Sequence, residues 1–119
     1  MTHRDLEVYK LSMNLVGDIY RLSRLFPKSE MFGLMSQMQR AAVSIPSNIA
    51  EGASRNSTKE YIHFLSISIG SSSELETQLG IVKILGYSDD SQLVESLMQD
   101  VDKIRYMLIK LMRSLGKKL

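Results

Sequence analysis

The chain has 119 residues, no cysteine and a formal net charge of +2, with 44% apolar and 24% charged residues. This composition is typical of one folded domain, and it excludes intrinsic disorder, a disulfide framework and thiol chemistry. No apolar run approaches the roughly 18 residues that span a bilayer, and the first residues lack the apolar core of a signal peptide. We therefore expect a cytoplasmic protein that does not enter a membrane.

Four segments have helical periodicity and none has sustained strand alternation. Turn residues separate them at Phe26–Ser29, at Gly52–Asn56 and at Gly86–Asp90. The pattern predicts helices at about residues 5–25, 30–53, 57–85 and 90–115. Short connections force neighbouring helices to run antiparallel, so we expect an all-α, up-down-up-down four-helix bundle that forms a single domain over residues 1–119.

The middle of the chain, from Arg40 to Leu79, has the clearest local signals. Pro46 lies inside the second helix, where it removes one backbone hydrogen bond and favours a bend. Ser57 and Glu60 have the spacing of a capping box at the start of the third helix. Small residues around Gly70 predict that another helix approaches the third helix closely.

A second apolar row on the first and third helices predicts self-association. One row per helix is enough for the core of a monomer, and a helix that is apolar on most of its circumference is buried on most of it. We therefore expect a homo-oligomer. The alternative is a thick core with scattered apolar surface residues, which are normal on any protein. The predicted interface residues are Leu6, Tyr9, Met13, Val16, Tyr20, Ile62, Ile67 and Ile69.

Enzymatic chemistry has little support in the sequence. Glu60 and His63 have the Glu-x-x-His spacing of di-iron bundles, but that site needs a second such motif and two more glutamates. The other histidine, His3, lies at the start of the chain, and the glycines are isolated rather than gathered in a phosphate loop. We expect no catalytic residue, no metal and no cofactor.

A polar row lies opposite the apolar face of the second helix, at Gln37, Arg40, Ser44, Asn48, Glu51 and Arg55. Such a row is either a solvated face or a hydrogen-bonded network, internal or between subunits, in which Arg40 or Arg55 meets a glutamate (Glu51, Glu74 or Glu76). A partly buried arginine needs a carboxylate partner, and several carboxylates are near, which favours the network. The residues assigned to this structural polar network are Arg40, Asn48, Glu51, Glu74 and Glu76.

The end of the fourth helix is the best candidate for a nucleic-acid surface, because no acidic residue follows Asp102. Four cations on one face of this helix form what we call the basic stripe. The stripe is roughly 21 Å long, enough to contact several phosphates. An antiparallel bundle places it beside Arg4, Arg55 and Lys59. The alternative, that these charges complement the helix dipole and aid solubility, stays open. The basic stripe comprises Lys103, Lys110, Arg113 and Lys117, with Tyr106 on the same face.

Several stretches resemble the family of small four-helix-bundle proteins encoded by intervening sequences of bacterial 23S ribosomal RNA genes. The resemblance covers nearly the whole chain and implies a homo-oligomer, in the form of a pentameric ring. It extends more distantly to the accessory bundle protein of diversity-generating retroelements, which implies nucleic acid and a reverse transcriptase as partners. Gln39 departs from the family pattern, where a second basic residue is expected beside Arg40. The stretches that carry the resemblance are 6–9, 26–27, 39–52 (QRAAVSIPSNIAEG), 57–61 (STKEY) and 70–79 (GSSSELETQL).

Two functions follow as hypotheses. The first is a non-enzymatic, homo-oligomeric bundle that binds RNA or DNA by its phosphates, through the basic stripe with Arg55 and Lys59 nearby. The second is a protein-interaction scaffold without a nucleic-acid role. The salt dependence of nucleic-acid binding separates the two, because phosphate contacts release counterions.

Overall fold

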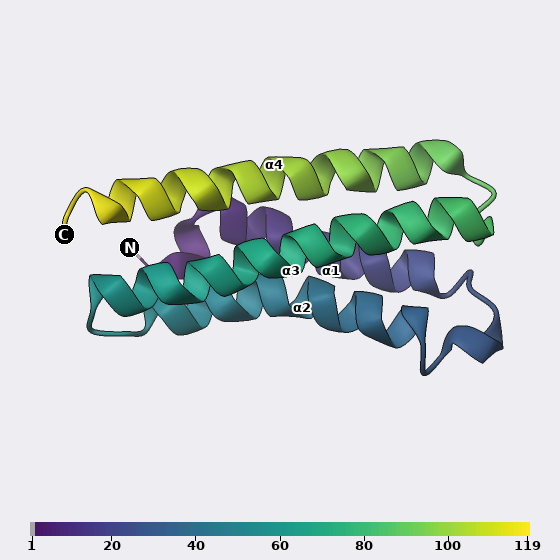
Figure 1. Ribbon diagram of the computed structural model, residues 1–119, viewed down its shortest axis with the longest axis horizontal. Coiled ribbons are helices and arrows are strands. Elements are labelled where there is room, and N and C mark those ends of the chain that lie inside the picture. The colour runs from purple at the N-terminus through teal and green to yellow at the C-terminus, as the bar shows by residue number, and fades with distance from the viewer. Residues whose placement is uncertain (1) are drawn as a thin grey trace.

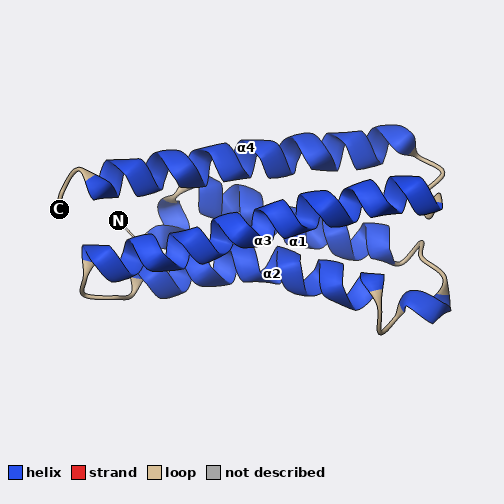
Figure 2. Ribbon diagram, in the orientation of Figure 1, coloured by secondary structure: helices blue, strands red, loops and turns tan. Residues whose placement is uncertain are grey.

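Four α-helices account for most of the chain in the computed structural model, which describes residues 2–119. They are α1 (Glu7–Ser23), α2 (Leu34–Ala53), α3 (Thr58–Leu85) and α4 (Ser91–Gly116). Two short 3-10 turns, η1 (His3–Asp5) and η2 (Lys28–Glu30), precede α1 and α2. Within the described residues there is no strand, so the prediction of an all-α fold is confirmed (Figure 2).

The helices pack around a square, in which each contacts its two neighbours. α1 and α3 both pack against α2 and α4, while neither diagonal pair is in contact within residues 2–119. Figure 1 shows that the chain reverses direction at every connection, as in an up-down-up-down bundle. The molecule measures 46 × 25 × 21 Å.

The core lies along the axis of this square, and its residues recur about every three or four positions along each helix, as the helical periodicity of the sequence predicts. Each helix contributes apolar side chains that are almost fully buried. The largest of them are Leu15, Ile19, Leu22, Met38, Ile45, Ile49, Leu65, Leu75, Leu79, Ile104 and Leu108.

α2 begins at Leu34, later than the expected start near residue 30. The preceding segment forms η2 instead, and the Glu30 carboxylate returns to accept a hydrogen bond from the Leu34 backbone N–H at 3.2 Å. Gly33 lies between them, where an added Cβ would meet Glu30 Oε1 at 2.7 Å. The side chain of Glu30 therefore ends the turn and starts the helix, which periodicity alone does not reveal.

The other helix ends follow local chemistry. Ser57 Oγ accepts a hydrogen bond from the Glu60 N–H at 3.2 Å, which is one half of the predicted capping box. Among the described residues, Glu60 does not return the second bond, whereas Thr2 and Asp5 form both halves before η1. Gly86 ends α3 in the left-handed region, with φ of 66°, where glycine is unstrained.

α2 and α3 approach each other closely along the stretch around Pro46. α2 continues through this proline as one helix. Ser68 Oγ donates to the Ile45 carbonyl at 2.9 Å, and Ser71 Oγ donates to Ser44 Oγ at 2.7 Å. Two serines in the middle of α3 thus supply hydroxyls to α2. Their role is interhelical hydrogen bonding, which holds the two helices together near the proline. The predicted close approach at Gly70 itself is wrong, because this glycine is exposed and an added Cβ would meet nothing within 4 Å.

A tyrosine–carboxylate contact connects the two loops at the other end of the bundle. Tyr87, in the α3–α4 loop, donates its hydroxyl to Glu30 Oε2 at 2.6 Å, and its ring lies 5.3 Å from that of Phe26. The hydrogen bonds from Tyr87 and from the Leu34 N–H lower the pKa of Glu30. The ionised carboxylate is the form that this arrangement stabilises.

Glu30→Gln is therefore expected to lower the free energy of unfolding at neutral pH. A carboxyl whose pKa is lower in the folded state stabilises the protein above its unfolded pKa, and this contribution is lost as pH falls through the folded pKa. The difference between wild type and Glu30→Gln should shrink as pH falls below the ordinary pKa of glutamate, about 4.3, and be smallest below the lowered pKa of the folded state, where Glu30 is protonated in both states. Urea unfolding over a pH series measures it. Tyr87→Phe should reproduce the effect, and a difference that is constant with pH would contradict it.

Candidate nucleic-acid interface

The basic stripe lies on the outer face of α4. Val101, Ile104 and Leu108 fix the opposite face in the core, so the residues between them point outward. Within residues 2–119, none of the four cations of the stripe forms an ion pair. Tyr106 is 65% exposed beside them. The stripe thus presents cations without ion-pair partners and an accessible ring.

Arg105, also on α4, faces α3 instead. Its guanidinium lies 2.8 Å from Glu76 Oε2 and 2.6 Å from Asp102 Oδ1, and both partners raise its pKa. Hydrogen bonding to Asp102 and to Arg105 lowers the pKa of Glu76, while the contact with Glu76 raises the pKa of Asp102. This cluster joins α3 to α4 and leaves Arg105 without free charge for a phosphate.

The two ends of the stripe differ in their surroundings. Lys103 shares a hollow of about 210 Å³ between α1 and α4 with Asp18 and Asp100. Burial and the nearby Asp18 raise the pKa of Asp100, while Lys103 lowers it. Phosphates are less attracted to this acidic region than to the end of α4. The uncompensated part of the stripe therefore runs from Lys110 to Lys117.

Arg55 and Lys59 lie at the same end of the bundle as the last turn of α4, as an antiparallel arrangement predicts (Figure 1). Arg55, however, is already engaged. It pairs with Glu51 at 2.7 Å, and its guanidinium carbon lies 4.9 Å from the centre of the Phe64 ring. Lys59 is exposed. Of the two predicted contacts, Lys59 is the one whose charge is available.

The predicted oligomer interface is largely covered by the bundle itself. Leu6, Tyr9, Val16 and Ile69 pack against the core of their own chain, because the second row of α1 lies toward α2. Tyr20, for example, lines a hollow with Gln39 and Val43 of α2. Ile62 is half-buried. The members that stay exposed are Met13 (49%), Ile67 (38%) and Tyr20 (37%).

The five residues assigned to one polar network belong to separate contacts. Arg40 is exposed and has no ion pair within the described part of the chain. The five residues form no single network within residues 2–119, because the carboxylates lie on different sides of their helices, with Glu76 facing α4. A network between subunits stays a prediction. The observed pairs are Asn48 with Ser44, Glu51 with Arg55, Glu74 with Gln78 and Glu76 with Arg105.

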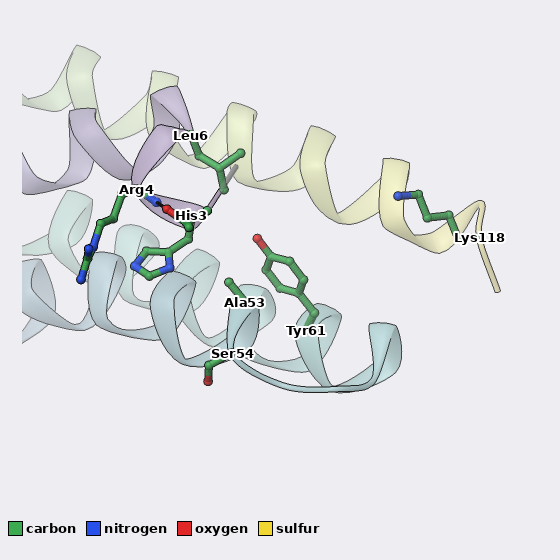
Figure 3. A pocket seen from close by; sticks show the side chains of 8 residues that line it. His3, Arg4, Leu6, Ala53, Ser54, Tyr61 and Lys118 are labelled. Atoms are coloured by element: carbon green, nitrogen blue, oxygen red, sulfur yellow. Dashed lines mark hydrogen bonds between the residues drawn. The ribbon is translucent and has the colours of Figure 1, made fainter.

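Sequence reasoning missed an open hollow of about 790 Å³ at the end of the bundle where the stripe ends (Figure 3). Three segments that are distant in sequence form it: the N-terminal segment, the α2–α3 connection and the residue after α4. The signal was the antiparallel topology, which brings these segments together. The lining residues are Thr2, His3, Arg4, Leu6, Ala53, Ser54, Tyr61 and Lys118.

Residues 2–119 contain no cluster of metal-binding side chains and no helix suited to cross a membrane. No group of three or more His, Asp or Glu side chains is placed to hold a metal ion there. Glu60 and His63 instead line a shallow hollow with Arg55, Lys59 and Phe64. No helix in the same residues is long and apolar enough to cross a membrane.

Comparison with known proteins gives two similarities. A family model described as "23S rRNA-intervening sequence protein" matches residues 4–110. The fold is similar to a crystal structure of a protein with unknown function from the S23 ribosomal protein family of Bacteroides thetaiotaomicron VPI-5482, with a TM-score of 0.81 and 24% identity. That similarity covers 88% of this chain and 97% of the other. None of the curated proteins matches the chain.

Proposed function

Because this chain belongs to the family of 23S rRNA-intervening sequence proteins, we propose that it is a cytoplasmic, non-enzymatic homo-oligomer that binds RNA or DNA by its phosphates. One observation carries the proposal: Lys110, Arg113 and Lys117 are exposed without ion-pair partners in residues 2–119, on a helix with no acidic residue after Asp102. Tyr106 adds an exposed ring for a base to stack on.

The chemistry of the stripe favours contacts with the backbone of a nucleic acid rather than with base edges. Lysine and arginine on an exposed helix neutralise phosphates and release counterions, and these contacts carry no sequence information by themselves. Neither an amide side chain nor a carboxylate stands among the stripe residues to read a base edge. We expect binding that depends strongly on salt and little on sequence.

Self-association would multiply this surface. Met13, Tyr20 and Ile67 are large apolar residues that remain exposed on α1 and α3, which lie on opposite corners of the bundle. A contact between two such different surfaces would be heterologous, and heterologous contacts form a ring when the rotation between subunits closes, whereas a two-fold dimer pairs one surface with itself. The pentameric ring that the family resemblance implies fits this pattern. Several stripes in one particle would raise local charge and avidity beyond what a net charge of +2 provides.

One preparation of the protein tests both parts of the proposal, which are self-association and binding to the phosphates of a nucleic acid. Light scattering is expected to give a mass several times the 13.5 kDa of one chain. Fluorescence anisotropy with a structured RNA should give an affinity that falls linearly on a log–log plot against salt, with a slope of about −2 to −4 for three or four phosphate contacts.

Each part can fail by itself. A particle of 13.5 kDa at the concentration used for binding contradicts the oligomer. An affinity for RNA that is insensitive to salt, or no affinity at low salt, contradicts the phosphate contacts. The protein-interaction scaffold would then be the better hypothesis, and the exposed side chains at the other end of the bundle, Phe32 (92%) and Ile84 (83%), would be the place to test it.

A further inference from the structure

A shallow hollow of about 400 Å³, which we call the corner hollow, opens where the chain turns from α2 into α3. Its lining comes from the turn itself and from the first two turns of α3, and none of the residues of the basic stripe belongs to it. The hollow thus brings two aromatic rings together with side chains of both charges. The lining residues are Arg55, Lys59, Glu60, His63 and Phe64.

Three of these side chains form one cluster around the Phe64 ring. The guanidinium carbon of Arg55 lies 4.9 Å from the centre of this ring, and the centre of the His63 ring lies 5.5 Å from it. The two rings meet edge to face, with an angle of 69° between their planes. Aromatic rings and guanidinium planes are the groups on which proteins stack unpaired bases. The cluster therefore gathers three planar groups of this kind at one point of the surface.

Neighbouring contacts hold the cluster in place. Glu51 pairs with Arg55 at 2.7 Å and so fixes the guanidinium from the end of α2. Phe64 packs closely against the same end, where a Cβ added to Gly52 would lie 2.9 Å from the Phe64 Cβ. Phe64 is half-buried, whereas Arg55 and His63 are exposed. Groups that are preorganised in this way bind a ligand at a lower entropic cost than mobile side chains do.

The charges of the corner hollow favour a base over a phosphate. The Glu60 carboxylate repels a phosphate, but it accepts hydrogen bonds from the N–H groups of a base edge. Lys59 forms no ion pair among the described residues, so it can neutralise the phosphate of the same nucleotide. A volume of about 400 Å³ lies near the lower end of the range for small-ligand sites. The hollow therefore has room for one nucleotide.

We propose that the corner hollow binds one unpaired base of a single-stranded RNA, which stacks against Arg55 and His63 beside the Phe64 ring. This inference rests on the proposed function, because the phosphate contacts of the basic stripe hold the strand. The stripe ends at the same end of the bundle as the α2–α3 turn (Figure 1). The corner hollow adds a contribution to the affinity that depends on bases, which phosphate contacts do not give.

The test compares two single-stranded RNAs of about 10 nucleotides that carry the same number of phosphates. One has a base at every position, and the other consists of abasic residues. Fluorescence anisotropy at one low salt concentration measures both affinities. Arg55→Lys keeps the charge but removes the planar group. It should weaken binding of the base-bearing RNA about tenfold, the effect of one lost stacking contact, and leave binding of the abasic RNA unchanged. His63→Gln, which removes the ring, should act in the same way.

Arg21→Lys is the matched control. Arg21 is exposed and pairs with the carboxylate of Asp18, much as Arg55 pairs with Glu51. In the part of the chain that the structure describes, however, only Arg55 lies over an aromatic ring. Arg21→Lys should therefore bind both RNAs as wild type does. Phe64 is left unchanged because it supports the α2–α3 turn, and circular dichroism checks that each variant is folded.

The outcomes separate this inference from the proposed function. Equal losses of affinity for both RNAs would show that the cluster acts through charge or through the fold, and would overturn the base site. If both variants bind the base-bearing RNA as wild type does, the base site is also wrong, while phosphate binding by the stripe stands. If wild type binds neither RNA, the proposed function fails and the base site fails with it.

Discussion

Gly52→Ala is expected to lower the free energy of unfolding by about 2 kcal/mol, although alanine is the better helix former. A Cβ at Gly52 would lie 2.9 Å from the Phe64 Cβ, 3.0 Å from Tyr61 Cδ1 and 3.2 Å from the Tyr61 carbonyl oxygen. Two of these atoms belong to or adjoin the backbone of α3 and cannot rotate away. The helices must separate, and such overpacking costs about 1–3 kcal/mol or more, which exceeds the gain in helix propensity of about 1 kcal/mol.

Gly70→Ala is the matched control for this prediction. Gly70 lies in the middle of α3 and an added Cβ would meet nothing within 4 Å, so alanine should raise the stability by up to about 1 kcal/mol. Urea unfolding followed by circular dichroism measures both variants. If Gly52→Ala is as stable as Gly70→Ala, the close approach of α2 and α3 is wrong.

The double charge reversal Lys110→Glu, Arg113→Glu is expected to weaken RNA binding by about 100-fold at low salt. Each lost phosphate contact removes about one unit from the slope of log affinity against log salt, so the slope should fall by about 2. The new carboxylates also repel the backbone. Neither residue forms an ion pair in residues 2–119, so the substitutions leave no carboxylate without its partner. The fold should therefore be unaffected.

Arg24→Glu, Lys28→Glu is the control for that measurement. It changes the net charge by the same amount at the opposite end of the bundle, where both residues are exposed. The control should lower the affinity only through the long-range field, by a few-fold at most at physiological salt, because charges beyond about 8 Å are largely screened there. Equal losses in the two double variants would show that net charge, and not the stripe, determines binding.

The candidate site was predictable to the extent that it lies on one helix. The spacing of the stripe residues, from Lys103 to Lys117, places them on one face of the helix, so the sequence alone predicts that face. In the structure the face is exposed. The pairing of Arg55 with Glu51 was also within reach, because it is an i, i+4 contact. Its stacking on Phe64 was not, because that contact joins two helices across a turn.

The failures have a common cause. Periodicity gives the angle of a residue around its own helix but not which neighbour covers that angle. Tyr9 and Val16, for example, were predicted at an oligomer interface, and both are also partly buried against the core of their own chain. Glu74 and Glu76 were likewise predicted in one network, although only Glu76 faces Arg105 of α4.

The sequence by itself determined the four helices, their antiparallel order and the residues of the core, because these depend on local spacing, turn chemistry and short connections. Only the tertiary structure decided which cations are free, which apolar residues remain exposed and where a hollow opens. Asp18 of α1 lies beside Asp100 and Lys103 of α4, and Tyr61 and Lys118 line one hollow, although these partners are far apart in the chain. They depend on how the helices are rotated against each other, and packing of the whole bundle sets that rotation.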